Sequence, residues 1–173
     1  FAMILGTRTQ VSYWKDSFTL YEHTLAVTKD NYIAHSNLGQ GLLEQKRFDQ
    51  AAVHILRAYE IRPDSPEANA NLAFLYMVSG RHEQALEFVR KALSQKPRDA
   101  KVYYNCGLIL EAAGQAGRAL EVYRQAVQAD PDHFTSLNRI GVLKEKEGLP
   151  QEAGEFYRKS IQSNPHYAEG HKN

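Results

Sequence analysis

The sequence is poor in the features that most catalytic, metal-binding and membrane-spanning proteins need. Its 173 residues include one cysteine, Cys106, so neither an internal disulfide framework nor a site of several cysteines can form. Lysine and arginine number 21 against 20 aspartate and glutamate, which leaves no basic excess to bind nucleic-acid phosphates. No apolar run approaches the ~20 residues that span a bilayer. Glycine-rich phosphate loops are missing as well, so we expect no nucleic-acid partner and no cofactor.

The histidines do not form the clusters that a metal site requires. Seven are spread along the chain, at positions 23, 35, 54, 82, 133, 166 and 171. None belongs to the i, i+4 pair with a further carboxylate ligand that builds zinc sites on helices. We interpret them as solvated surface residues, and we interpret Cys106 as a small buried apolar residue. The sequence therefore predicts no metal site and no catalytic residue.

What the chain does have is an internal repeat. Four columns of residues recur at intervals of 34. The first column is proline: Pro63, Pro97, Pro131 and Pro165. Two columns are small residues: Ala51, Ala85, Ala119 and Ala153, then Ala58, Ala92, Ala126 and Ser160. The fourth is an apolar residue followed by a small one: Leu38-Gly39, Leu72-Ala73, Cys106-Gly107 and Ile140-Gly141.

Helix physics explains these columns. Within each period the apolar positions follow helical spacing, which predicts two amphipathic helices per repeat. Gly80, Gly114 and Gly148 supply the left-handed residue that ends the first helix, and Lys46 occupies this position in the first period. Small side chains let the two helices approach closely. The proline ends the second helix, and residues such as Ser65, Asp99 and Asp132 can cap the next one. We expect Lys144, at an otherwise apolar position, to pack its stem on the core with its ammonium in solvent.

This pattern resembles the tetratricopeptide repeat (TPR), which has the same length, Leu-Gly dipeptide, small-residue positions and closing proline. The resemblance implies an all-α fold, a right-handed α-solenoid of antiparallel helix pairs. It divides the chain into four complete repeats: 32–65, 66–99, 100–133 and 134–167.

The two ends of the chain are less regular. Residues 1–31 are predicted to form degenerate N-terminal helices, with Lys15–Thr28 as a lone second helix whose Tyr21 and Leu25 pack on the helix that starts near Tyr32. Residues 168–173 line up with the first positions of a further, truncated repeat. Stacked repeats need a polar cap on their last apolar face, and none is encoded here. The chain is therefore expected to be part of a longer array or to associate with a second copy.

A narrower resemblance rests on the segment from Trp14-Lys15-Asp16-Ser17 to Leu38-Gly39. It is similar to the corresponding region of bacterial-type membrane proteins that join a mannosyltransferase-like transmembrane half to a C-terminal TPR array. This resemblance implies that Phe1–Gly6 is the end of a transmembrane helix and that the repeats lie on the extracytoplasmic side of a membrane. A wholly soluble TPR protein, cytoplasmic in location, is the alternative.

In the TPR family the first helices line a concave groove. Carried onto this chain, the family's groove positions predict a set of residues that contact an extended peptide or protein: Asn37, Gln40, Asn71, Phe74, Lys101, Tyr104, Asn105, Leu108, Asn138 and Arg139. The asparagines at 37, 71 and 105 form one column, and Arg139 continues it. Amides in such a ladder can pair with a peptide backbone regardless of its sequence, as in the TPR arm of O-GlcNAc transferases. The alternative is that the column holds neighbouring repeats together.

Three functions follow from these observations. The first is a non-catalytic scaffold that binds a protein or extended peptide in the groove. The second is an accessory domain that presents acceptor proteins to a membrane glycosyltransferase, and the third is a self-association module that uses the uncapped end. The basic clamp by which chaperone-binding TPRs hold a C-terminal carboxylate is incomplete, because Ser36, Ala70 and Phe74 do not match it.

Overall fold

The computed structural model describes residues 17–28 and 30–164, and within these ranges all regular structure is helical. The helices follow one another with short connections, in this order: α2 (Ser17–Val27), α3 (Tyr32–Glu44), α4 (Phe48–Ile61), α5 (Pro66–Val78), α6 (His82–Ser94), α7 (Ala100–Ala112), α8 (Ala116–Ala129), α9 (Phe134–Lys146) and α10 (Pro150–Ser163).

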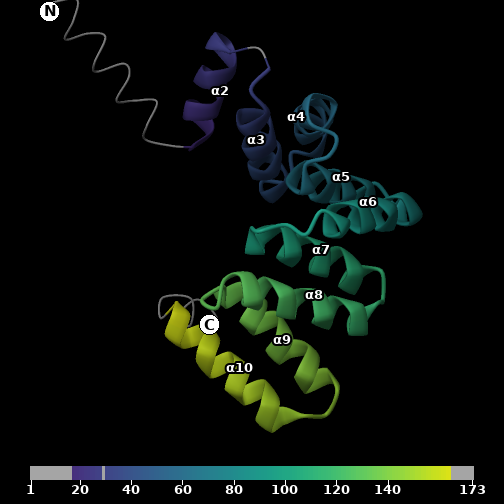
Figure 1. Ribbon diagram of the computed structural model, residues 1–173, viewed down its shortest axis with the longest axis vertical. Coiled ribbons are helices and arrows are strands. Elements are labelled where there is room, and N and C mark those ends of the chain that lie inside the picture. The colour runs from purple at the N-terminus through teal and green to yellow at the C-terminus, as the bar shows by residue number, and fades with distance from the viewer. Residues whose placement is uncertain (1–16, 29, 165–173) are drawn as a thin grey trace, which may run out of the picture.

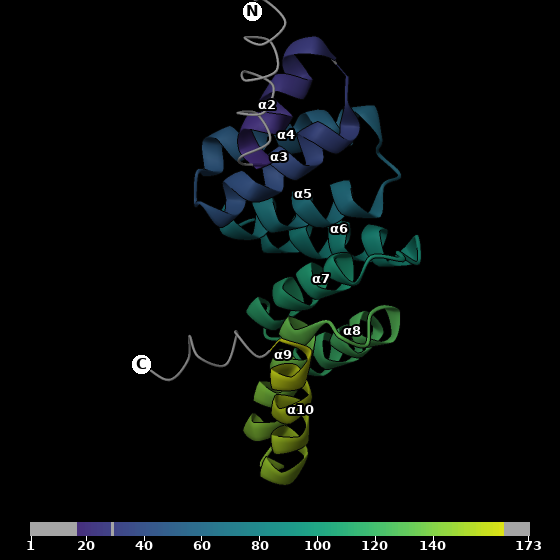
Figure 2. The same cartoon turned by 90° about the vertical axis from the view of Figure 1, so that its left-hand side faces the viewer.

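The helices form consecutive antiparallel pairs that stack into a right-handed α-solenoid, as the TPR resemblance implied (Figure 1). Each of the pairs α3–α4, α5–α6, α7–α8 and α9–α10 packs most closely within itself. Figure 2 shows the stack from the side, with the pair directions turning from the α2 end to the α10 end. None of the helices in the described ranges is long and apolar enough to cross a membrane.

The helix ends follow the predicted local chemistry, with one exception. The Ser65 side chain accepts a hydrogen bond from the backbone N–H of Ala68, and Asp99 accepts one from Lys101, so both cap the helices that follow them. Asp132 does not cap α9. The residue before α9 is His133, and the Asp132 carboxylate instead accepts a hydrogen bond from the hydroxyl of Ser163, 3.2 Å away.

The turn after the first helix of each pair requires a left-handed residue. Gly80, Gly114 and Gly148 have φ values of 74°, 74° and 78°. Lys46 takes the same conformation, with φ of 59°, as expected from its place in the repeat. A Cβ atom in this region clashes with the following carbonyl oxygen at a cost of about 1–2 kcal/mol, so Lys46 is strained where glycine is not.

The core runs through the stack as apolar side chains between successive layers. Near the start, Leu38, Leu42, Ile55 and Leu72 form one cluster, against which Tyr21 and Leu25 of α2 pack. The prediction that α2 packs on α3 is thereby confirmed. The predicted transmembrane-helix end at residues 1–6 and the truncated repeat at 168–173 lie outside the described residues, and the repeat boundaries remain a prediction.

Lys144 is buried, as its predicted packing on the core requires, but its ammonium is not left to solvent alone. Its side chain is only 10% exposed, and its ammonium nitrogen lies 2.9 Å from a carboxylate oxygen of Glu147 and 3.4 Å from one of Glu152. The ammonium therefore makes ionic contacts with two exposed carboxylates at the surface. The hydrogen bond to Glu147 is the largest cause of a raised Lys144 pKa.

Candidate functional site

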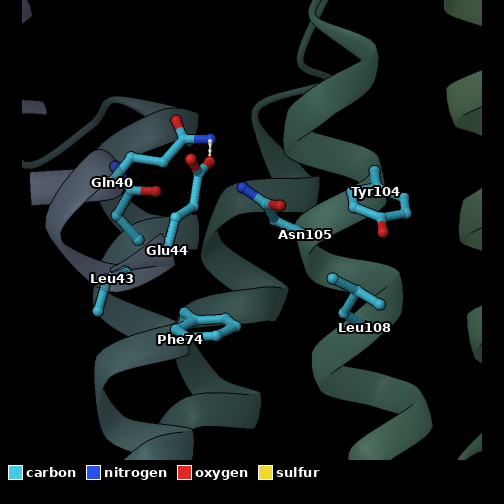
Figure 3. Close-up of a pocket in the computed structure, with 8 residues that line it drawn as sticks. Gln40, Leu43, Glu44, Phe74, Tyr104, Asn105 and Leu108 are labelled. Atoms are coloured by element: carbon cyan, nitrogen blue, oxygen red, sulfur yellow. Dashed lines mark hydrogen bonds between the residues drawn. The ribbon is translucent and has the colours of Figure 1, made fainter. Parts of the chain in front are cut away.

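A pocket opens between the first helices α3, α5 and α7, where the repeat register places the groove. Its volume is about 330 Å³, and its lining is Gln40, Leu43, Glu44, Asn71, Phe74, Tyr104, Asn105 and Leu108. Figure 3 shows the Phe74 ring and the side chains of Leu43 and Leu108 on one side of the pocket, with Gln40, Glu44 and Asn105 on the other. The pocket thus has an apolar floor and a polar rim.

The predicted binding residues divide between the pocket and the surface beyond it. Those in the pocket are Gln40, Asn71, Phe74, Tyr104, Asn105 and Leu108. Asn37, Lys101, Asn138 and Arg139 do not line it. Leu43 and Glu44 also line it, and both stand at family groove positions of the first repeat. The 34-residue register places them there, because they occupy the same positions as Met77 and Val78 of α5.

The asparagine column does not behave as one set. Asn71 is 4% exposed, and its amide nitrogen donates to the backbone carbonyl of Ser36 at 3.4 Å and to the Ser36 hydroxyl at 3.3 Å. The Asn37 amide donates to the phenol oxygen of Tyr21 at 3.0 Å. Both bonds join one layer to the layer before it. Asn105 is half-buried in the pocket wall, and among the described residues nothing is hydrogen-bonded to its amide.

Beyond the pocket the groove side becomes charged. The Arg139 Nε atom lies 3.8 Å from one carboxylate oxygen of Glu111, and the Lys146 ammonium lies 3.5 Å from the other. Glu111 also accepts a hydrogen bond from the phenol of Tyr123, 3.1 Å away. Lys101 is exposed on the same helix as Glu111. Two cations therefore share the Glu111 carboxylate, and Glu145, an exposed acid, follows on α9.

Four histidines in the described ranges are less exposed than predicted: His23, His35, His54 and His133. The Nδ1 atoms of His35 and His54 lie 3.1 Å apart between α3 and α4, and both side chains are half-buried. His133 is half-buried too, with its ring 5.5 Å from the Tyr104 ring and its Nδ1 atom 2.8 Å from the Ser136 hydroxyl. These four histidines are thus solvated only in part, whereas His82 is exposed as predicted. Burial is the largest cause of a lowered pKa at His54 and at His133.

The groups that could support chemistry are few. Cys106 is 0% exposed, and burial raises the pKa of its thiol to about 12, so it stays a protonated core residue at neutral pH. No group of three or more histidine, cysteine, aspartate or glutamate side chains lies close enough to hold a metal ion in the described part of the chain.

Comparison with known proteins identifies the class to which this solenoid belongs. Two family models described as tetratricopeptide repeat match the chain, one over residues 42–105 and the other over residues 16–66 and 104–168. The second model alone spans more than half of the 173 residues. The chain therefore belongs to the tetratricopeptide repeat family.

Relatives and solved structures add detail. A stretch of 59 residues is 32% identical to human protein O-mannosyl-transferase TMTC3, and the mouse protein of that name matches equally. The match takes in 34% of this chain but spans only 6% of the length of these relatives. Their mannosyltransferase activity and any membrane half thus remain outside what the match supports for this chain.

Two solved structures share the fold over most of the chain. The crystal structure of MamA superposes with a TM-score of 0.64 and 20% sequence identity, and the match covers 95% of each chain. PilF of Pseudomonas aeruginosa superposes with a TM-score of 0.69 and 29% identity, over 78% of this chain and 61% of the other. Both support the α-solenoid, and the MamA likeness shows the fold alone.

Proposed function

We propose that this chain is a non-catalytic scaffold that binds an extended peptide or protein segment along the groove side of α3, α5 and α7. The pocket between these helices carries the proposal. Its apolar floor of Leu43, Phe74 and Leu108 can desolvate an apolar side chain of the partner. The Asn105 amide on the rim offers two donors and an acceptor to the partner's backbone.

The division of the asparagine column refines this proposal. The Asn71 amide nitrogen donates to Ser36 and so links α5 to α3. Asn105 has no such engagement among the described residues, so it is the member of the column that we assign to the partner. Gln40 and Glu44, whose side chains lie 3.5 Å apart, form the opposite rim.

The test is to select binders from a random dodecapeptide library displayed on phage and to measure their dissociation constants by fluorescence anisotropy. We expect Phe74→Ala to weaken binding by roughly 10-fold or more, as truncation of a pocket anchor does. Phe48→Ala is the matched control, because Phe48 is an exposed phenylalanine of α4 outside the pocket. If Phe74→Ala and Phe48→Ala bind the selected peptides with the same dissociation constant, the peptide-binding site does not lie in this pocket.

Phe74 also packs against the core, so its truncation needs a companion. Gln40→Trp adds a ring at the pocket mouth without removing a core side chain. It should block the selected peptides while leaving the melting temperature close to that of the parent. Unimpeded binding to a folded Gln40→Trp variant would also argue against the pocket.

The TMTC3 match favours a second candidate, an accessory domain that presents acceptor proteins to a membrane glycosyltransferase. The test is to read the coding sequence upstream of Phe1. A series of apolar segments of ~20 residues, each long enough to span a bilayer, would support this candidate. A soluble upstream sequence would remove it and leave the scaffold proposal unchanged.

A further inference from the structure

Halfway along the stack, one groove position changes from aliphatic to acidic residues. The core position beneath it changes from aliphatic residues to tyrosine at the same point. At one groove position the successive helices carry Leu43, Met77, Glu111 and Glu145. At the position beneath, the second helices carry Ile55, Val89, Tyr123 and Tyr157. Aliphatic residues thus pair with aliphatic residues in the first two layers, and glutamate pairs with tyrosine in the last two.

Hydrogen bonding explains this joint change. The Tyr123 phenol donates to Glu111 at 3.1 Å, and the Tyr157 phenol donates to Glu145 at 2.9 Å. Tyr123 is 0% exposed, and a hydroxyl in that position needs an acceptor that an aliphatic side chain cannot provide. The Glu111 carboxylate is therefore part of the packing and is only 16% exposed, whereas Glu145 and its hydrogen bond with Tyr157 are exposed.

The cations around Glu111 are far more accessible than the carboxylate they share. The Arg139 side chain is 37% exposed and the Lys146 side chain is 65% exposed. One carboxylate, already bonded to Tyr123, faces the two cations Arg139 and Lys146. The positive charge of these two side chains is therefore only partly balanced by Glu111. At the opposite end of the pocket the charged residue is Glu44, an acid.

We propose that the partner segment carries an apolar side chain for the pocket and an acidic side chain for Arg139 and Lys146. This inference rests on the proposed peptide-binding function and names the chemistry of its partner. Arg139 and Lys146 lie on α9, one to two layers beyond the pocket. Helix layers lie about 8–10 Å apart and an extended chain advances about 3.3 Å per residue, which places the acidic side chain roughly three to six residues from the apolar one. The occupant is an acidic, extended protein segment.

The experiment uses three fluorescein-labelled peptides that differ only in charge. Each has a central phenylalanine in a glycine–serine background. On each side of the phenylalanine, the third and fourth residues are both glutamate, both glutamine or both lysine. Dissociation constants are measured with the 173-residue chain at low and at moderate salt. We expect the glutamate peptide to bind about 3- to 10-fold more tightly than the glutamine peptide, and the lysine peptide to bind most weakly. Salt should narrow these differences.

Variants locate the preference on the protein. The double change Arg139→Gln and Lys146→Gln should remove the advantage of the glutamate peptide. Glu111→Gln should increase it, because the amide still accepts from Tyr123 but no longer opposes an acidic ligand. The matched control, Arg158→Gln with Lys159→Gln on α10, makes the same change in net charge on exposed residues away from the groove and should leave the preference intact.

The outcomes distinguish failure of the acidic specificity from failure of the proposed peptide-binding function. If the three peptides bind equally and Gln40→Trp abolishes binding, the pocket is the site and the acidic specificity is refuted. A preference for glutamate that survives loss of Arg139 and Lys146 also refutes it. If none of the three peptides binds, both proposals are overturned.

Discussion

Gly107 provides the sharpest test of how the layers pack. A Cβ atom built on Gly107 would lie 2.4 Å from Cε1 and 2.7 Å from Cδ1 of Tyr123, well inside contact distance. Tyr123 is 0% exposed, and its phenol is bonded to Glu111, so the ring cannot move without disturbing both. Overpacking of this kind costs about 1–3 kcal/mol. We therefore expect Gly107→Ala to lower the free energy of unfolding by that amount.

The preceding layer shows which pair of residues avoids this clash. One layer earlier the same two positions hold Ala73 and Val89, both 0% exposed. In a Tyr123→Val background the space above position 107 matches that layer, so Gly107→Ala should cost nothing there. The two changes should thus couple favourably by about 1–3 kcal/mol, within the range seen for residues in contact. Tyr123→Val alone leaves a cavity and should cost about 2–4 kcal/mol.

The assay is urea unfolding followed by far-ultraviolet circular dichroism, with melting temperatures as a second measure. A loss of 1 kcal/mol corresponds to roughly 2–4 °C in a protein of this size. Gly154→Ala in α10 is the control, because nothing lies within 4 Å of its added Cβ atom. It should stabilise the helix by about 0.5–1 kcal/mol. If Gly107→Ala is as stable as Gly154→Ala, or if the penalties in the double variant simply add, the packing argument is refuted.

Three further predictions follow from single residues. Lys46→Gly should raise the free energy of unfolding by about 0.5–1 kcal/mol, because it relieves a left-handed backbone at φ 59°; no gain in urea unfolding would contradict this. Asn71→Ala should cost about 1–2 kcal/mol by removing the bond to Ser36, whereas Asn105→Ala should stay within about 0.5 kcal/mol, and equal losses would contradict the division of the column. The pKa of His54 is lowered, first by burial and then by His35, so the unfolded chain takes up this proton at a higher pH than the folded one. Stability should therefore be steady above about pH 6.5 and fall as the pH drops below it, and His54→Gln should flatten that fall in urea titrations at several pH values.

Much of the architecture could be predicted from the sequence. Residues recurring every 34 positions specified two helices per layer, the small residues between them and the left-handed turn after each first helix, including the strained Lys46. These features depend on local backbone geometry and on the helical period, both of which are encoded within one repeat. The same register indicated which residues face the groove, and so it indicated the pocket wall.

Contacts between layers could not be predicted in this way. Asn71 and Asn105 hold the same repeat position, yet only Asn71 finds a hydroxyl in the previous layer, because Ser36 stands where the next layer has Ala70. Likewise, the sequence predicts a solvated ammonium for Lys144, and only the structure places Glu147 and Glu152 beside it. The sequence by itself determined the helices, their order and their faces. Only the tertiary structure decided which polar side chains are engaged and which remain available to a partner, because that depends on the distance and geometry between groups in different layers.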